Sequence, residues 1–243
     1  MMCSSIDTPS FPERIEALDW EKILQTLYFQ GFAKTGQILN LQECHQIINL
    51  YGDRAQFRSH VKMEQYRFGQ GEYQYFAYPL PVIVQSLRET VYPYLLSVAN
   101  TWNQELGNVF RFANTLEKFL ETCHRAKQVR PTPLLLKYES GDFNCLHQDL
   151  YGELTFPLQM AILLSEPGED FVGGEFVLVE QKPRTQSRVH VAPLHRGEAV
   201  IFAVSHRPVQ GTRGFYRVNL KHGVSQIHSG QRYCLGIIFH DAT

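Results

Sequence analysis

The chain has 243 residues with 44% hydrophobic and 19% charged residues, and its net charge at pH 7 is −1. This is the composition of a globular protein with one sizeable core, and the near-zero net charge gives no general indication of a nucleic-acid or membrane-surface protein. No apolar run reaches the roughly 20 residues of a membrane-spanning helix, and the first 20 residues lack the apolar segment of a secretory signal. The five cysteines show no CxxC pair, which favours free thiols in the cytoplasm: Cys3, Cys44, Cys123, Cys145 and Cys234.

The first half of the chain predicts helices, because apolar residues recur there at helical spacing behind capping residues. Four helices are expected. Their signals are a cap at Asp19 with a stop at Gly31, a capping box at Asn40 and Glu43 with an end at Gly52, a long apolar pattern over 81–102 with an interruption or a kink near Pro93, and a cap at Asn114.

An aromatic segment, YRFGQGEYQYFAYP, occupies residues 66–79 between the second and third of these helices. Its alternating rings and its two glycines predict a hairpin. Tyr73 and Tyr75 share one face of an extended chain, so they are candidate substrate contacts on a segment that closes as a lid. The alternative is that these rings fill the core between helices and sheet.

After residue 130 the pattern changes to short strands separated by glycine and proline turns. Closely spaced short strands are typical of a sandwich or barrel. Eight strands are expected, near 133–139, 143–148, 154–164, 174–180, 188–192, 198–203, 214–224 and 231–240. No linker separates the two halves, so a single domain over 1–243 is expected.

His147 and Asp149 follow a strand-like run in LLLKYESGDFNCLHQDLYGE. Residues i and i+2 of a strand point to the same face, and their Cα atoms lie roughly 6.6 Å apart, so both side chains can reach one metal ion. A histidine and a carboxylate are two thirds of the facial triad that leaves positions open on Fe(II). On spacing alone, a polar surface strand end is the favoured explanation of the pair.

The C-terminal stretch YRVNLKHGVSQIHSGQRYCLGIIFH adds a third ligand and a cation. It reads as two strands joined by a loop at residues 228–230, which places His222 and Arg232 on one face, roughly 13 Å apart. A metal-bound His222 and an inward Arg232 would bracket a short dianion.

At this point the sequence resembles the 2-oxoglutarate/Fe(II) dioxygenases, nearest to their prolyl-hydroxylase-like branch, over about residues 132–241. The resemblance is carried by LLLKYESGDFNCLHQD, AILLSEPGEDFVGGEFVLVE, PLHRGEAVIF and HGVSQIHSGQRYCLGIIF, which occur in the family's order. It implies an α+β fold with a double-stranded β-helix (jelly-roll) catalytic core over 132–243, supported by helices and the aromatic hairpin over 1–131.

The resemblance also implies the site. His147, Asp149 and His222 would hold Fe(II), Arg232 would bind the far carboxylate of 2-oxoglutarate, and Tyr138 would hydrogen-bond to it. O2 is the other cosubstrate, and ascorbate is a further candidate cofactor. That branch often has Lys where this chain has Arg232. The implied reaction couples decarboxylation of 2-oxoglutarate to succinate with hydroxylation of an unactivated C–H bond.

Alternatives remain open for the distal ligand and for the substrate. His206 also precedes an arginine but reads as a loop residue, so His222 is favoured. A protein, peptide or amino-acid substrate is the first expectation, with no membrane partner. A nucleic-acid demethylase is the second, because residues 181–232 contain nine basic residues and a single acidic residue, Glu198. The basic residues are Lys182, Arg184, Arg188, Arg196, Arg207, Arg213, Arg217, Lys221 and Arg232. A cupin-like, non-redox metal protein is the third.

Overall fold

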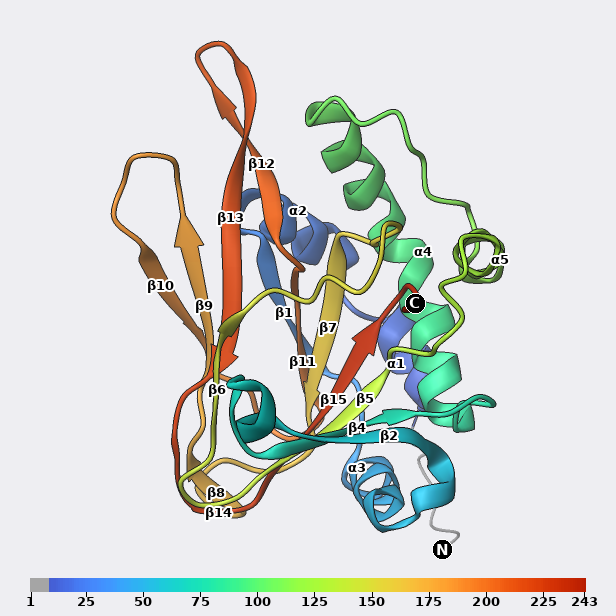
Figure 1. The fold of residues 1–243 in the computed structure, drawn as a ribbon, viewed down its shortest axis with the longest axis vertical. Coiled ribbons are helices and arrows are strands. Elements are labelled where there is room, and N and C mark those ends of the chain that lie inside the picture. The colour runs from blue at the N-terminus through green and yellow to red at the C-terminus, as the bar shows by residue number, and fades with distance from the viewer. Residues whose placement is uncertain (1–8) are drawn as a thin grey trace, which may run out of the picture.

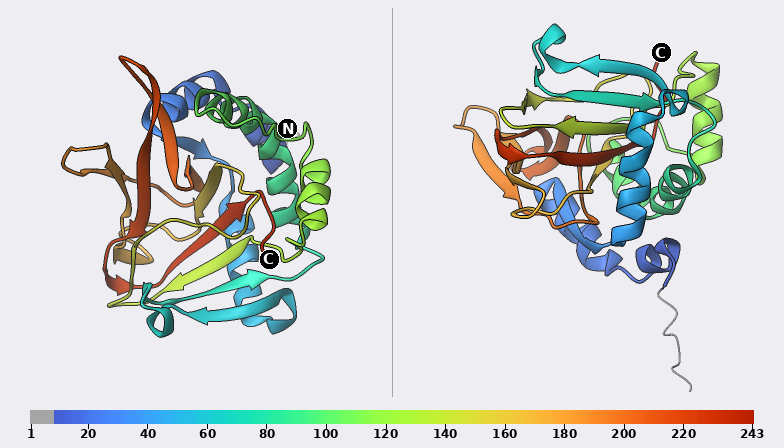
Figure 2. Two further views of the ribbon diagram at one scale, coloured as in Figure 1. Left: turned by 45° about the horizontal axis from the view of Figure 1, so that its top comes forward. Right: turned by 90° about the horizontal axis from the view of Figure 1, so that it is seen from below.

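The computed structural model describes residues 9–243, which form helices packed on one of two facing antiparallel sheets (Figures 1 and 2). The helices are α1 (Phe11–Glu16), α2 (Trp20–Gln30), α3 (Leu41–Asn49), α4 (Val82–Glu105) and α5 (Leu116–Arg125). The strands are β1 (Phe32–Gln37), β2 (Phe57–Lys62), β3 (Gly69–Gln70), β4 (Glu72–Phe76), β5 (Leu134–Tyr138), β6 (Phe143–His147), β7 (Leu158–Leu163), β8 (Phe171–Gly173), β9 (Phe176–Gln181), β10 (Arg188–Ala192), β11 (Glu198–Ala203), β12 (His206–Gly211), β13 (Gly214–Val224), β14 (Ile227–Gly230) and β15 (Arg232–Ile238).

The helix caps that the sequence predicts are present. The Asp19 side chain accepts a hydrogen bond from the Lys22 backbone N–H, and Gly31 ends α2 in the left-handed conformation at φ 79°. Asn40 and Glu43 form the reciprocal capping box of α3. These local hydrogen bonds explain why the helix starts were readable without tertiary information.

The structure narrows one helix prediction and contradicts another. α4 runs unbroken through Pro93, because its face that includes Tyr92 and Leu95 is buried in the core along the whole length. The N-cap of α5 is Thr115 rather than Asn114, and its side chain accepts from the Lys118 N–H.

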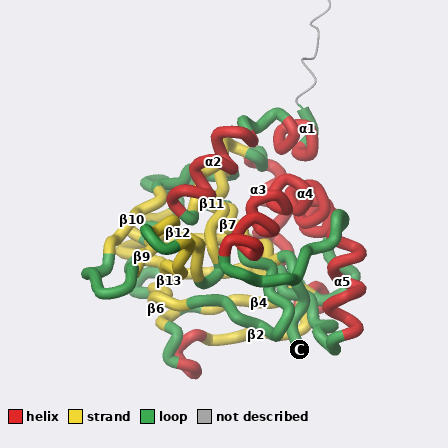
Figure 3. The backbone as a smooth tube through the Cα atoms, turned by 90° about the horizontal axis from the view of Figure 1, so that it is seen from above, coloured by secondary structure: helices red, strands yellow, loops and turns green. Residues whose placement is uncertain are grey.

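The larger sheet has the strand order β1-β11-β7-β15-β5-β4-β2, and the helices cover one of its faces (Figure 3). Successive side chains of β7 point to opposite faces of this sheet, and each face packs in a different cluster. Leu158, Met160 and Ile162 pack in the cluster that includes the helices, while Ala161 and Leu163 pack in a second cluster between the sheets. Because both faces are covered, every residue of β7 is buried.

The smaller sheet has the order β10-β9-β13-β6-β3, with β12 paired to β13. Its hairpins β9–β10 and β12–β13 extend beyond the body of the molecule as two ribbons (Figure 1). Together the sheets form the predicted jelly-roll-like sandwich. The predicted loop around His206 is wrong, because residues 206–211 are strand β12, antiparallel to β13.

Two predicted hairpins are also wrong. β13 lies in the smaller sheet and β15 in the larger one, and residues 227–230 are strand β14, which pairs with β8 as the chain crosses between the sheets. In the segment 66–79, β3 pairs with β6 and β4 pairs with β2 and β5. Strands β1, β2 and β4 therefore bring the first half of the chain into the larger sheet.

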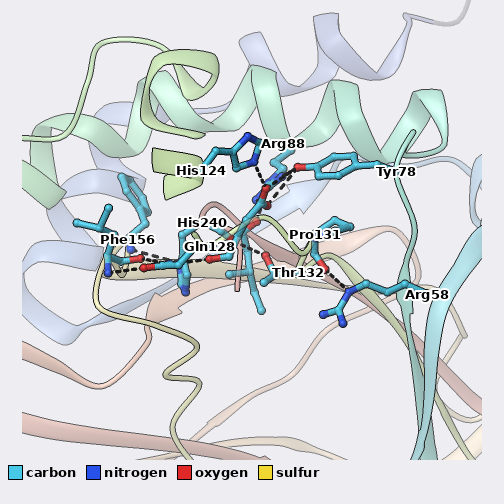
Figure 4. Close-up of polar contacts among 12 residues, drawn as sticks. Arg58, Tyr78, Arg88, His124, Gln128, Pro131, Thr132, Phe156 and His240 are labelled. Atoms are coloured by element: carbon cyan, nitrogen blue, oxygen red, sulfur yellow. Dashed lines mark hydrogen bonds and ion pairs between the residues drawn. The ribbon is translucent and has the colours of Figure 1, made fainter. Parts of the chain in front are cut away.

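A buried polar network ties α4 and α5 to the chain after β15 (Figure 4). The Asp241 carboxylate accepts hydrogen bonds from Arg88 and from Tyr78, and lies 2.7 Å from Nε2 of His124. The Gln128 side chain donates to the Asp241 carbonyl at 2.7 Å. Every polar atom of the Asp241 side chain thus has a partner, which fixes the helices against the sheet.

None of the helices in the described part of the chain is long and apolar enough to cross a membrane. Four cysteines are free thiols, and Cys3 lies outside the described residues: Cys44, Cys123, Cys145 and Cys234.

Candidate active site

The three predicted metal ligands converge between the sheets. His147 is the last residue of β6, and the antiparallel register places His222 of β13 directly opposite it. Asp149 lies two residues beyond His147, in the loop after the strand. Its Oδ1 is 3.5 Å from Nε2 of His147 and its Oδ2 is 3.2 Å from Nε2 of His222. One ligand atom from each residue lies within 4.8 Å of the others.

The ligand side chains are held in place by their neighbours. The Tyr151 hydroxyl donates to Oδ1 of Asp149 at 2.6 Å, and Nε2 of Gln159 donates to Oδ2 at 2.9 Å. Nδ1 of His147 lies 2.8 Å from the Cys145 carbonyl oxygen, which directs Nε2 towards Asp149. Two imidazoles and one carboxylate in this arrangement fit a divalent ion such as Fe(II), with coordination positions left open.

Burial and hydrogen bonding set the protonation of these groups. Burial opposes ionisation of Asp149, yet the hydrogen bonds from His147 and His222 hold its pKa well below the ordinary value. Burial lowers the pKa of His222. Burial also acts to lower the pKa of His147, but Asp149 outweighs it and the pKa is raised. Asp149 is therefore a carboxylate, the form that binds a cation.

Arg232 and Tyr138 lie in the same cavity as the triad, which has a volume of about 280 Å³. They face each other across β15 and β5, and the guanidinium carbon lies 5.5 Å from the centre of the Tyr138 ring. Arg232 is 1% exposed, and its Nε and Nη1 have no hydrogen-bond partner among the described residues. The Tyr138 hydroxyl accepts from Asn144 at 3.3 Å, and burial raises the pKa of Tyr138, so this hydroxyl keeps its proton.

A buried guanidinium with free N–H groups fits an anionic ligand, because leaving such donors unpaired is costly. A cosubstrate that chelates the metal and carries a carboxylate at its far end satisfies both ends of this cavity. The wrongly predicted hairpin still led to the right neighbours, because His222 and Arg232 reach the cavity from opposite sheets.

Two glycines shape the part of the cavity around Arg232 and Tyr138, and the sequence analysis assigned neither of them to it. A Cβ at Gly174 would lie 2.2 Å from Cδ1 of Ile227 and 3.0 Å from Cδ of Arg232. A Cβ at Gly71 would lie 2.9 Å from the Tyr138 ring. Only glycine allows this close approach at the positive φ angles found here, 65° and 118°. The glycine motifs FGQGE and FVGGEF were the available signal.

The two candidate substrate tyrosines separate in the structure. Tyr73 lines the cavity, whereas Tyr75 does not and is 8% exposed. Tyr75 lies behind Tyr73 at a ring-centroid distance of 5.4 Å and packs against Tyr151. A Cβ at Gly69 would lie 2.3 Å from the Phe143 carbonyl oxygen, where β3 pairs with β6. The lid stays a prediction.

His206 lies away from the triad. It pairs with Asn219 in register, its Nδ1 lies 2.8 Å from the Ser205 hydroxyl, and it is not among the residues that line the cavity. Of the two candidate distal ligands, only His222 joins His147 and Asp149 in the described structure.

Comparison with known proteins agrees with this geometry. A family model described as an oxygenase catalysing oxidative methylation of damaged DNA matches residues 71–242. The chain belongs to this family. Two uncharacterised proteins of Mycobacterium tuberculosis, from strains CDC 1551 / Oshkosh and ATCC 25618 / H37Rv, are each 47% identical over 167 residues, which cover 69% of this chain and 72% of theirs.

Solved structures of prolyl hydroxylases share the fold. A Pseudomonas putida prolyl-4-hydroxylase has a TM-score of 0.53 at 12% identity, with 92% of this chain and 99% of that chain covered. A Trichoplax adhaerens prolyl hydroxylase in complex with a hypoxia-inducible-factor peptide has a TM-score of 0.54 at 14% identity, with 92% and 89% covered.

The oxygenase family, the prolyl-hydroxylase-like fold and the triad together make this chain a 2-oxoglutarate/Fe(II)-dependent dioxygenase, as the sequence predicts. Its cofactor and cosubstrates are Fe(II), 2-oxoglutarate and O2, while a role for ascorbate stays a prediction. Membership of an oxygenase family removes the support for a cupin-like, non-redox protein.

Proposed function

We propose that the enzyme hydroxylates a methyl group on a damaged nucleobase, with Fe(II) on His147, Asp149 and His222, and 2-oxoglutarate on Arg232. The observation that carries the cosubstrate assignment is the buried guanidinium of Arg232 in the cavity of the triad, whose Nε and Nη1 have no partner among the described residues. The far carboxylate of 2-oxoglutarate accepts from Nε and Nη1 of Arg232. The Tyr138 hydroxyl donates a further hydrogen bond to it.

The residues around the triad keep the site dry and ordered. The rings of Phe176 and Phe202 pack against the His222 ring at centroid distances of 5.9 and 4.6 Å. Tyr151 and Gln159 each occupy one oxygen of Asp149, which restricts how that carboxylate rotates. When bound, the metal supplies the activation of O2, and the protein supplies orientation and water exclusion.

The overall reaction balances without another reductant. The substrate C–H bond and one carbon–carbon bond of 2-oxoglutarate break, and of the two oxygen atoms of O2 one enters the hydroxylated substrate and the other enters succinate. The methyl group becomes hydroxymethyl while 2-oxoglutarate becomes succinate and carbon dioxide. On a ring nitrogen, a hydroxymethyl group leaves as formaldehyde and the nitrogen keeps a proton. Repair of the base follows from the hydroxylation alone.

The family description and the shape of the site support a nucleobase. The family model names damaged DNA, and an oxygenase acts on a damaged base by oxidising it. Enzymes that act on a base take it out of the stack and hold it among aromatic side chains. Tyr73 and Phe68 line the cavity, and Phe68 stacks on Tyr66 at 5.6 Å, with both of these rings exposed.

A peptide substrate is the second candidate, and it was the first expectation from the sequence. Its support is the shared fold with prolyl hydroxylases, one of which was solved with a peptide. The family description outweighs it, because that description comes from a match to most of the chain, whereas the structural neighbours share only 12% and 14% identity.

Succinate formation decides between these substrates. Purified enzyme with Fe(II) and 2-oxoglutarate is supplied with oligonucleotides carrying N-methylated bases, with unmethylated oligonucleotides, or with proline-containing peptides. We expect only a methylated oligonucleotide to raise succinate formation above the rate without substrate, with formaldehyde formed in an amount equal to that increase. Stimulation by peptides alone would reject the nucleobase, and no succinate under any condition would reject the cosubstrate assignment.

A further inference from the structure

The two ribbons of the smaller sheet carry five exposed cations without ionic partners. Arg184 and Arg188 belong to the β9–β10 ribbon, and Arg213, Arg217 and Lys221 to the β12–β13 ribbon. None of the five forms an ion pair or a side-chain hydrogen bond with any residue from 9 to 243.

The acids of this region are already paired. Residues 176–224 contain two acids, Glu180 and Glu198. Oε2 of Glu180 lies 2.7 Å from Arg207 and its Oε1 lies 3.8 Å from Lys182, while Glu198 lies 3.6 Å from Lys34. The five cations are therefore not neutralised within the described chain, and together they form a positive field on the ribbons.

The cations of β13 share one face with an aromatic ring. Phe215, Arg217 and Lys221 are exposed along this strand, whereas the alternate residues Val218 and Leu220 are buried. Lys221 lies four positions after Arg217 along the strand, a distance of roughly 13 Å. Cations spaced along a strand, with an exposed aromatic ring on the same face, are typical of surfaces that bind along a nucleic acid strand.

The β12–β13 ribbon is connected directly to the metal site. Gln148 stands between the ligands His147 and Asp149, and its Nε2 donates to the carbonyls of Ser205 and Leu220 at 2.7 and 2.8 Å. These two carbonyls lie at the base of the ribbon, and the strand continues from Leu220 to the third ligand two residues later. The base of the ribbon therefore lies next to a metal ligand, and Arg217 and Lys221 project from the face of β13 opposite to His222.

We propose that the two ribbons, 176–192 and 206–224, bind the phosphodiester backbone of the nucleic acid strand whose damaged base enters the cavity. This proposal rests on the proposed substrate class and adds the surface that holds the strand. The ribbons supply affinity without sequence preference, because phosphate contacts carry no base information. The net charge of −1 hides this surface because acids elsewhere balance its five cations.

The test measures binding of a fluorescent single-stranded oligonucleotide with no methylated base, in DNA and RNA versions, over a range of salt concentrations. Arg213→Glu/Arg217→Glu tests one ribbon and Arg184→Glu/Arg188→Glu the other. The matched control is Lys22→Glu/Lys118→Glu, which makes the same charge change at exposed positions of α2 and α5.

We expect Arg213→Glu/Arg217→Glu to weaken binding at low salt by at least about tenfold. It should also reduce the slope of log affinity against log salt by about 1.4, since each lost phosphate contact on a single strand removes about 0.7. The control should keep the wild-type slope. All variants should keep wild-type decarboxylation of 2-oxoglutarate in the absence of substrate, which shows that the site is intact.

Equal weakening in ribbon and control variants, or wild-type binding without salt dependence, would overturn the ribbon assignment. If methylated bases are oxidised but ribbon variants bind normally, the ribbon surface fails and the proposed function stands. If the ribbons bind nucleic acid but no methylated base is oxidised, the surface stands and the proposed substrate fails.

Discussion

Arg88 and Arg232 are equally buried, at 0% and 1% exposure, but their surroundings differ completely. Arg88, on α4, donates from Nε to the Ile238 carbonyl, from Nη1 to Tyr78 and from Nη2 to Asp241 (Figure 4). Arg232, on the cavity side of β15, leaves Nε and Nη1 without partners. A buried charge is costly unless it is paired. Arg88 therefore stabilises the fold through its internal partners, whereas Arg232 is available to bind an anion.

This difference between the two arginines distinguishes two regions of the molecule. One is the Asp241 network, and the other is the cavity that contains the triad and Arg232. At the Asp241 network the protein satisfies its own polar groups and so gains a fixed geometry. In the cavity of the triad, Arg232 keeps Nε and Nη1 without partners among the described residues, and this lowers the stability of the protein in favour of binding. Substitutions in the first region should therefore change stability, and substitutions in the second should change ligand affinity.

The largest effect is expected at the metal ligands. His222→Ala should abolish high-affinity binding of one divalent ion and all 2-oxoglutarate turnover, because two ligands cannot hold the ion in place. His206→Ala is the control and should retain both. Metal titration by calorimetry gives a readout independent of activity. Loss of metal binding in His206→Ala with retention in His222→Ala would show that the triad is misassigned.

The two arginines provide the next largest contrast. Arg88→Met should lower the free energy of unfolding by about 3–5 kcal/mol, because it leaves the Asp241 carboxylate buried without its cation. Arg232→Met should not lower it, since Nε and Nη1 of that guanidinium have no hydrogen bonds to lose among the described residues.

Cosubstrate affinity should show the opposite order. Arg232→Met should raise the apparent KM for 2-oxoglutarate tens-fold or more, equivalent to roughly 2–5 kcal/mol for an unpaired buried carboxylate. Metal affinity should be kept, and folded Arg88→Met should retain the wild-type KM. Urea denaturation and steady-state kinetics measure the two quantities separately. An unchanged KM in Arg232→Met would show that Arg232 does not bind 2-oxoglutarate, and the contrast between the two arginines would then fail.

The contrast between these regions also explains what the sequence could reveal. The spacing of His147 and Asp149 and the helix caps depend on neighbours in the chain, so short-range reasoning was sufficient. The ten-residue interval from His222 to Arg232 matched the family pattern, but its physical interpretation as a hairpin was wrong. Ile227 and its neighbours pair with β8 instead, and that pairing depends on a strand more than fifty residues earlier in the chain.

The Asp241 network was not predicted at all. Its members come from three separate stretches of the chain, and none has a sequence signal as distinct as a metal-ligand motif. The close approach of Gly174 to Arg232 was hidden in the same way, because it depends on sheet packing rather than on the local turn.

His240 allows a more specific test. It is the neighbour of Asp241 in the chain, but one of its two ring nitrogens has no partner among the described residues. Its Nδ1 accepts from the Phe156 N–H at 3.2 Å, but its Nε2 is buried without a partner in the described structure. Burial, assisted by Arg88, lowers the pKa of His240 from 6.5 to about 4. Below pH 6.5 the unfolded chain therefore binds a proton that the folded chain refuses until about pH 4.

Stability from His240 is thus fully present above pH 6.5 and is lost as pH falls towards 4, by about 3 kcal/mol at 1.36 kcal/mol per pH unit. His240→Asn keeps an acceptor for the Phe156 N–H and removes the titration. Urea denaturation at pH 7 and at pH 4.5 should show a smaller loss in this variant than in wild type. Equal losses of unfolding free energy in the variant and the wild type would mean that His240 is already protonated in the folded protein at pH 4.5.

The smallest expected effect separates Tyr73 from Tyr75. Tyr73→Leu should raise the KM for the hydroxylated substrate several-fold, because the ring lines the cavity. Decarboxylation of 2-oxoglutarate without substrate should stay at the wild-type rate. Tyr75→Leu should instead lower the melting temperature, since its ring is buried against Tyr151 and lies 4.5 Å from the Arg58 guanidinium. If Tyr73→Leu lowers the melting temperature and leaves the KM unchanged, Tyr73 belongs with the structural residues, and the boundary of the ligand-binding region lies closer to the triad.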